Sequence, residues 1–272
     1  MIRRPFRFLL GLLATAAACR AKAPEQIPVI DVSLGDYFFH LPDTVPAGRV
    51  TFRLGAKGPH AHVMDVIRLE GGKTIKDVMA AGISVADSPW VKRLGGSVAA
   101  AEGGSASVTM NLTPGSYLLI CYFGDDDHVP HFAKGMAAPF VVSGAASAAA
   151  PPTPDLDIAL VDFDFNLSAP LSPGHHVIRV VNNAKQSHEV VISRLKDGFT
   201  PEQGRAWADS AAAKGPVPWE MVGGVGDLAP GDTIVMQADF KPGTYHLLCY
   251  FDDAASHKNH YELGMHKYLT VN

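Results

Sequence analysis

The sequence predicts an all-β protein built from two tandem Greek-key β-sandwich domains, each carrying one short helical insert. The 272 residues include 26 Gly and 20 Pro but only 8% aromatic residues, as in chains with many turns. Short apolar or alternating segments lie between turns of the Pro-Gly type, which indicates strands. The second half of the chain repeats the motifs of the first at almost constant spacing. A chain of this length can form two ordinary domains.

The N-terminal segment predicts export. Residues 1–7 contain three arginines, and residues 8–18 form an apolar run of eleven. These are the n-region and h-region of a secretory signal, and the run is too short to span a bilayer. We therefore expect residues 1–18 to be a signal peptide and the mature protein to be bacterial, either periplasmic or anchored to a membrane.

The anchor is expected at Cys19. The small residues that precede this cysteine resemble a bacterial lipoprotein signal, in which the cysteine is lipidated and becomes the new N-terminus. The position three before it is Ala16, where that signal usually has Leu, Val or Ile. The alternative is ordinary cleavage after the Ala-Ala-Ala of residues 16–18, which would leave a soluble periplasmic protein.

The charge balance argues against a nucleic-acid or anionic-membrane binder. The chain has a formal net charge of −4, and removal of Arg3, Arg4 and Arg7 with the signal changes it to −7 (−4 minus 3). Proteins that bind such polyanions are normally basic. No nucleic-acid partner is expected.

The repeat defines the domains. Residues 27–143 and 155–272 can be aligned, and the Ala- and Pro-rich segment 144–154 between them predicts a solvated, partly stiff linker. The matching motifs begin at His62 and His188, Pro89 and Pro218, Pro114 and Pro242, and His131 and His260.

The expected elements follow the same order in both halves. Strands are predicted at 50–54, 107–112, 117–121 and 139–142, and at 177–181, 233–238 and 267–271. Thr200, Pro201 and Gln203 form the N-cap, first position and capping box of a helix that continues to Lys214, with a counterpart at 74–81. Trp90 and Trp219 recur at equivalent positions and are expected to pack each helix against its sandwich.

Cys121 and Cys249 occupy the same place in each repeat. Equivalent points of two separate domains have no structural reason to lie within disulfide reach, so we expect both cysteines to be free thiols.

Four chemically distinctive residues recur in each half, and they suit copper. One thiolate and two imidazoles can form a trigonal set, with a thioether as a long axial ligand. The predicted metal ligands are His62, Cys121, His131 and Met136 in the first half, and His188, Cys249, His260 and Met265 in the second.

The motifs Asn182-Asn-Ala-Lys-Gln-Ser-His188, Pro242-Gly-Thr-Tyr-His-Leu-Leu-Cys249 and His260-x4-Met265 resemble those of the cupredoxins, the blue copper proteins. The resemblance implies a cupredoxin-like sandwich and a type 1 copper site in each half. The gaps Cys121-x9-His131 and Cys249-x10-His260 are longer than in small blue proteins. They are similar to the loop in the first domain of copper nitrite reductase, which has the same His-x4-Met ending.

Three other histidines compete for these roles. His60 competes with His62, and His128 and His257 lie in the loops that follow the cysteines. The register of the strand after His62 and the repeated His-x4-Met step favour the set given above. The acidic runs 125–127 and 252–253 in the same loops indicate a solvated surface, a docking patch or a second cation site.

The predicted function is electron transfer through type 1 copper, with an unidentified redox partner such as a cytochrome. The alternatives are a two-domain copper oxidase or nitrite-reductase-like enzyme and a copper storage or delivery protein. The enzymes usually have a histidine immediately before the type 1 cysteine, where this chain has Ile120 and Leu248. No second copper cluster can be assembled from the remaining histidines, which favours a carrier over a catalyst.

Overall fold

A computed structural model describes residues 25–272 apart from positions 59, 101, 126–128, 148 and 211–214. The predicted signal peptide, Cys19 and the alternative ligand His128 lie outside these residues. Within the described part of the chain, no helix is long and apolar enough to cross a membrane.

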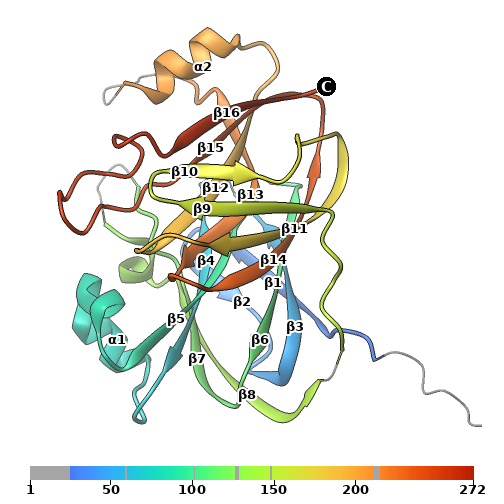
Figure 1. Ribbon diagram of the computed structural model, residues 1–272. Coiled ribbons are helices and arrows are strands. Elements are labelled where there is room, and N and C mark those ends of the chain that lie inside the picture. The colour runs from blue at the N-terminus through green and yellow to red at the C-terminus, as the bar shows by residue number, and fades with distance from the viewer. Residues whose placement is uncertain (1–24, 59, 101, 126–128, 148, 211–214) are drawn as a thin grey trace, which may run out of the picture.

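The first half contains the strands β1 to β8 and the helix α1 (Figure 1). Their bounds are β1 Val29–Gly35, β2 Phe38–His40, β3 Thr44–Ala56, β4 Val63–Leu69, α1 Ile75–Ala81, β5 Val91–Val98, β6 Ser105–Leu112, β7 Gly115–Ile120 and β8 Ala137–Ser147. Two 3-10 turns, Gly82–Asp87 and His131–Lys134, complete it.

The second half repeats this order element for element. Its bounds are β9 Leu156–Val161, β10 Asp164–Leu167, β11 Gly174–Asn182, β12 His188–Leu195, α2 Pro201–Ala208, β13 Trp219–Leu228, β14 Thr233–Phe240, β15 Gly243–Leu248 and β16 His266–Val271. Each strand and helix expected from the sequence overlaps one of these elements, and the fold is the predicted all-β one.

Each half packs two layers of strands face to face. In the second half, β9, β11 and β14 form one layer, and β13, β12, β15 and β16 form a separate sheet. In the first half, β3 joins the two layers, because it pairs with β1 and β6 on one side and, through Thr44 to Gly48, with β8 of the layer β8, β7, β4 and β5. The parallel pair β1–β3 recurs as β9–β11, whereas β4–β7 and β12–β15 are antiparallel. Apolar side chains from the facing layers of both halves form one continuous core.

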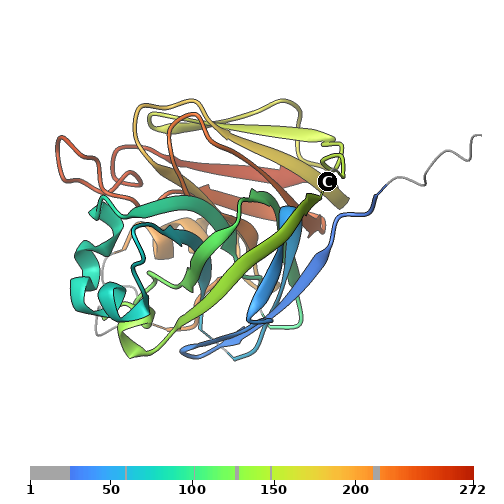
Figure 2. The same ribbon diagram turned by 90° about the horizontal axis from the view of Figure 1, so that it is seen from below.

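The two halves are joined through equivalent strands. Strand β6 pairs antiparallel with β14, in the register Ser107 to Gln237, Val108 to Met236 and Thr109 to Val235. Figure 1 shows the second half above the first with this seam between them, and Figure 2 shows the two halves in contact along it. Residues 144–146 of the predicted linker are exposed, as expected, but they are part of a strand, because β8 continues through them to Ser147, which pairs with Gly48.

The capping box predicted for α2 is present. The Thr200 N–H donates to Oε1 of Gln203 at 2.8 Å, and the Gln203 N–H donates to Oγ1 of Thr200 at 3.3 Å. The helix ends at Ala208, and its predicted end at Lys214 lies outside the described residues. The Trp219 indole N–H donates to the carbonyl of Gly204 at 3.2 Å, so this tryptophan packs α2 onto the sandwich as expected. Trp90 packs beside Ile75 and Ala81 of α1.

Candidate metal centres

The first centre lies where three elements of the first half meet. His62 directly precedes β4, Cys121 directly follows β7, and His131 begins the 3-10 turn of the next loop. The Nδ1 atoms of His62 and His131 are 3.2 Å apart, and Nδ1 of His131 is 3.5 Å from Sγ of Cys121. All three side chains are buried. Two imidazole nitrogens and one sulfur therefore converge on a single point.

The loop backbone fixes the histidine and the methionine relative to the cysteine. The N–H of Cys121 donates to the carbonyl of Met136 at 3.2 Å, and the N–H of Phe132 donates to the carbonyl of Cys121 at 3.0 Å. The N–H of Met136 donates to the carbonyl of His131 at 2.9 Å, which closes the turn around Gly135. The His-x4-Met spacing is the length of this turn. Met136 is fully buried and adjoins the cysteine through its own backbone.

The second centre repeats this geometry. The Nδ1 atoms of His188 and His260 are 3.0 Å apart, and Sγ of Cys249 lies 3.8 Å from the first and 3.3 Å from the second. The N–H of Cys249 donates to the carbonyl of Met265, and the N–H of Met265 donates to the carbonyl of His260. All four side chains are fully buried.

These separations fit one soft metal ion in each centre. An ion about 2 Å from each imidazole nitrogen and about 2.3 Å from the sulfur would separate trigonal ligands by roughly 3.5 to 3.8 Å. In both centres the three ligand atoms lie within 4.8 Å of one another. A thiolate with two imidazoles and a neighbouring thioether is the donor set that copper takes in type 1 sites. Copper is the cofactor that suits both centres.

In each centre, a carboxylate is hydrogen-bonded to the outward-facing nitrogen of one of the two histidines. Nε2 of His131 is 2.8 Å from Oδ1 of Asp125, and Nε2 of His188 is 2.9 Å from Oδ1 of Asp162. Nε2 of His62 lies 3.5 Å from Oδ1 of Asp36, the residue equivalent to Asp162. A carboxylate on Nε2 fixes the tautomer that leaves Nδ1 free to bind a metal.

Hydrogen bonds from Lys134, Tyr37 and His131 lower the pKa of Asp125. At Asp162, burial acts to raise the pKa of the carboxyl group. The hydrogen bonds that this group accepts from His188 and from the Lys185 N–H outweigh burial, so the pKa of Asp162 is lowered as well. Both carboxyl groups therefore stay ionised opposite the histidines.

Backbone N–H groups point at each sulfur. The N–H of Val63 lies 3.4 Å from Sγ of Cys121, and the N–H of Glu189 lies 3.5 Å from Sγ of Cys249. Burial nevertheless raises the pKa of Cys121 to about 12 and raises that of Cys249 as well. Without a cation each sulfur is a neutral thiol, and both cysteines are free, as predicted.

The other candidate histidines lie elsewhere. Nδ1 of His60 pairs with Asp36 at 2.9 Å, with 47% of its side chain exposed, and His257 is exposed. The outer carboxylates Asp36 and Asp162 were not predicted from the sequence. Their signal was available, because an Asp-aromatic pair recurs at 36–37 and 162–163 before the second strand of each half.

The strand order, with a histidine before β4 or β12 and a cysteine after β7 or β15, decides the fold assignment. The chain has the cupredoxin fold. Its two type 1-like centres sit at equivalent ends of the two sandwiches.

No family model and no curated protein matches this chain. Among solved structures, it aligns with dithionite-reduced auracyanin from Roseiflexus castenholzii at 21% identity and a TM-score of 0.29, covering 43% of this chain and 94% of that one. A multicopper oxidase aligns at 15% identity and a TM-score of 0.26, covering 90% of this chain and 88% of the other. A copper-containing nitrite reductase from Thermus scotoductus aligns at 13% identity and a TM-score of 0.25, covering 90% and 61%.

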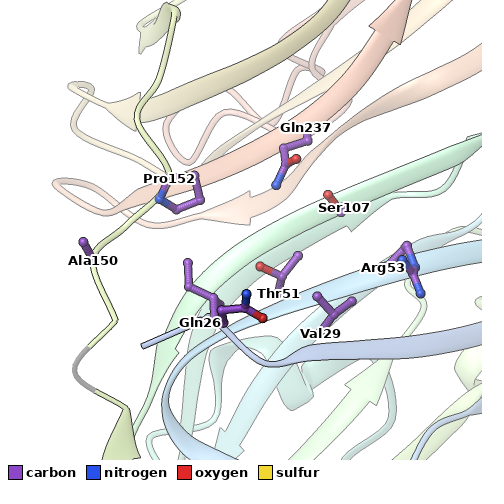
Figure 3. Close-up of a pocket in the computed structure, with 9 residues that line it drawn as sticks. Gln26, Val29, Thr51, Arg53, Ser107, Ala150, Pro152 and Gln237 are labelled. Carbon is purple, nitrogen blue, oxygen red and sulfur yellow. The ribbon is translucent and has the colours of Figure 1, made fainter. Parts of the chain in front are cut away.

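A shallow groove of about 420 Å³ lies away from both centres, across the seam between the halves (Figure 3). Thr51 and Ser107 line it from the first half, and Gln237 lines it from the second. Arg53 is its charged residue, and its guanidinium is already paired with Asp31 at 2.6 Å. The groove adds no chemistry to either metal centre.

Proposed function

We propose that this protein is an exported electron carrier that uses a type 1 copper ion in each half. The observation that carries the proposal is the convergence of two Nδ1 atoms and one Sγ in each centre, at separations that fit a trigonal ion. The signal-like N-terminus supports export, and a lipid on Cys19 would hold the carrier at a membrane.

Burial of the donor set supports electron transfer over catalysis. The three strong ligands and the methionine of each centre are at most 1% exposed, so a substrate has no open position to occupy. Bound copper would supply one-electron chemistry, alternating between Cu(II) and Cu(I). The protein's contribution is to hold the imidazoles and the sulfur in one arrangement for both states.

Each residue then has a defined role. His62, His131 and Cys121, with their counterparts His188, His260 and Cys249, would hold the copper ions. Met136 and Met265 would each supply a weaker thioether ligand. The N–H groups of Val63 and Glu189 stabilise negative charge on the sulfurs, and Asp125 and Asp162 orient the histidines.

The test is the optical and EPR spectrum of the copper-loaded chain together with its copper content. An intense thiolate-to-copper band in the visible and two copper ions per chain are expected. A stoichiometric loading that gives no such band would contradict the proposal.

Stopped-flow oxidation by a cytochrome, compared with turnover of nitrite, oxygen or phenols, separates the carrier from the enzyme. Rapid exchange with the cytochrome without turnover is expected. Substantial turnover that disappears in His60→Ala while the visible band persists would reveal a second copper centre and favour the enzyme.

A further inference from the structure

The two metal centres are linked by a short path through the interface between the halves. The path starts at Cys121, whose Sγ accepts from the Val63 N–H at 3.4 Å. The side chain of Val63 then reaches across the interface to Gly226 of β13: a Cβ added at Gly226 would lie 2.8 Å from Cγ2 of Val63. Two residues further along β13, Leu228 pairs with His188, a proposed ligand of the second centre.

Gly226 is a glycine because the two halves approach so closely there. An added Cβ would overlap the carboxylate of Asp65 as well as crowd Val63. Gly95 of β5 faces Gly226 in turn, since a Cβ at Gly95 would lie 3.3 Å from the Gly226 carbonyl oxygen. Because neither glycine has a side chain, β5 of the first half packs closely against β13 of the second half. The last residue of β13, Leu228, pairs with His188 of the second centre.

A salt bridge fixes this contact. Arg93 of β5 lies 3.3 Å from Oδ2 of Asp227, and its NH2 group donates to Oγ of Ser187 at 3.1 Å. Ser187 directly precedes His188, and Asp227 lies between Gly226 and Leu228. Arg93 of the first half thus contacts two segments of the second half beside its metal centre, one through Ser187 and the other through Asp227. The carboxylate of Asp227 is almost fully buried, so the geometry of the pair is constrained.

We infer that the two centres exchange electrons within a single chain, through the contact between Val63 and Gly226. With copper bound in both centres, one electron would pass from the reduced centre to the oxidised one. No bond forms or breaks and no proton moves, so the two centres are each other's oxidant and reductant. Electronic coupling decays less steeply through covalent and hydrogen bonds than across gaps, and the contact between Val63 and Gly226 is the place where this path crosses from one half to the other. The inference rests on the proposed function.

The experiment injects less than one electron equivalent per chain into the fully oxidised, copper-loaded protein by pulse radiolysis and follows the redistribution. Cys121→Ser and Cys249→Ser supply the reference spectrum and potential of each remaining centre. Where the two bands coincide, Met265→Gln separates them by changing the axial ligand of one centre. A first-order phase whose rate is independent of protein concentration, and absent from both single-centre variants, is expected. A rate proportional to protein concentration, or no redistribution, would overturn the inference.

The path itself is tested by Gly226→Ala, which pushes Val63 away and should slow the exchange at least several-fold. Gly55→Ala is the matched control, because a methyl group there meets open space and the backbone is not left-handed. Should Gly226→Ala fail to fold, Val63→Ala removes the bridging methyl groups and keeps the N–H donor, with the equally buried Val66→Ala as its control. Unchanged exchange in Gly226→Ala, or in Val63→Ala where it is the folded variant, would exclude this contact as the path.

The two proposals fail separately. If the single-centre variants lack a type 1 spectrum, the proposed function is wrong. If both variants show that spectrum and react with a cytochrome but the intact chain shows no concentration-independent exchange, the inference alone is wrong.

Discussion

In the first half, the outward nitrogen of His131 is held by Asp125, which also accepts from Tyr37 at 2.5 Å and from Lys134 at 2.8 Å. In the second half the histidine at the strand has the closer carboxylate, Asp162, while Nε2 of His260 is buried without a hydrogen-bond partner among the described residues. The ligand atoms of the two centres are of the same kinds and lie at similar separations. The support around them has diverged, which shows that a repeated ligand set does not require a repeated outer shell.

A second difference lies on the outer face of the sheet, beneath each helix. In the first half this space holds an apolar cluster that includes Leu118 and Phe132. The equivalent residues of the second half are His246 and Tyr261, and His246 stacks on Tyr268 with ring centroids 4.2 Å apart. On the opposite face of β15, Tyr245 and Leu247 pack in the core that both halves share. The core face of the repeat has therefore kept its apolar character, and the outer face has changed.

The largest effect expected is the loss of one centre. Cys249→Ser should remove one copper ion per chain and about half of the visible band, and Cys121→Ser should do the same for the other centre, because each sulfur serves a separate site. Copper analysis with optical spectroscopy measures both. Loss of both ions in either single variant would show that the centres are interdependent in binding.

His246→Leu copies Leu118 into the second half. Burial, followed by the nearby His266, lowers the pKa of His246 from 6.5 to about 4. The folded state therefore keeps this histidine neutral, and the stability it contributes is present above pH 6.5 and is lost as the pH falls towards 4. The shift corresponds to about 3 kcal/mol.

Denaturant unfolding of the metal-free protein at a series of pH values should show a shallower acid decline in His246→Leu than in the natural chain. The exposed His175→Leu serves as the control. Identical pH profiles for the natural chain and His246→Leu would mean that His246 is protonated as readily in the folded as in the unfolded state.

Asp125→Asn and Asp162→Asn test the difference between the outer shells. Each should weaken copper binding at its own centre roughly 10- to 100-fold, because the ligating histidine loses its charged partner. Competition with a chelator, performed in the Cys249→Ser and Cys121→Ser backgrounds respectively, isolates the two effects. Asp239→Asn, in an exposed carboxylate that pairs with His175 and with no metal ligand, should change neither affinity.

Gly204→Ala carries the smallest expected effect. Gly204 of α2 is the residue equivalent to Val78 of α1. A Cβ added at Gly204 would lie 2.7 Å from both the Trp219 ring and Leu195. Overpacking should outweigh the gain in helix propensity, for a net loss of about 1 kcal/mol. Chemical denaturation measures it, with Glu202→Ala on the same helix as reference. A stabilised Gly204→Ala would show that the tryptophan can move aside.

Residues with a local physical signature could be predicted from the sequence. The capping box at Thr200, the turns before the strands and the repeated Cys, His and Met positions depend on neighbours in the chain. The pairing of Val108 with Met236 could not be predicted in this way, because the local sequence of an edge strand does not show which other strand it will pair with. The loop carboxylate Asp125 was predicted to belong to a solvated surface, but it is half-buried, because its hydrogen bond to His131 forms only when the loop folds back onto the cysteine.

The antiparallel pairing of β6 with β14 brings identical positions of two copies of one fold onto each other. That is the isologous contact by which two separate chains make a symmetric dimer. A gene duplication that fused the subunits of such a dimer would yield this molecule directly, with no new interface to evolve. The connecting segment between β8 and β9 then freed the copies to diverge, because a substitution in one no longer appears in the other. The polar cluster around His246 and the unmatched shell of His260 are the kind of asymmetry that a homodimer cannot acquire.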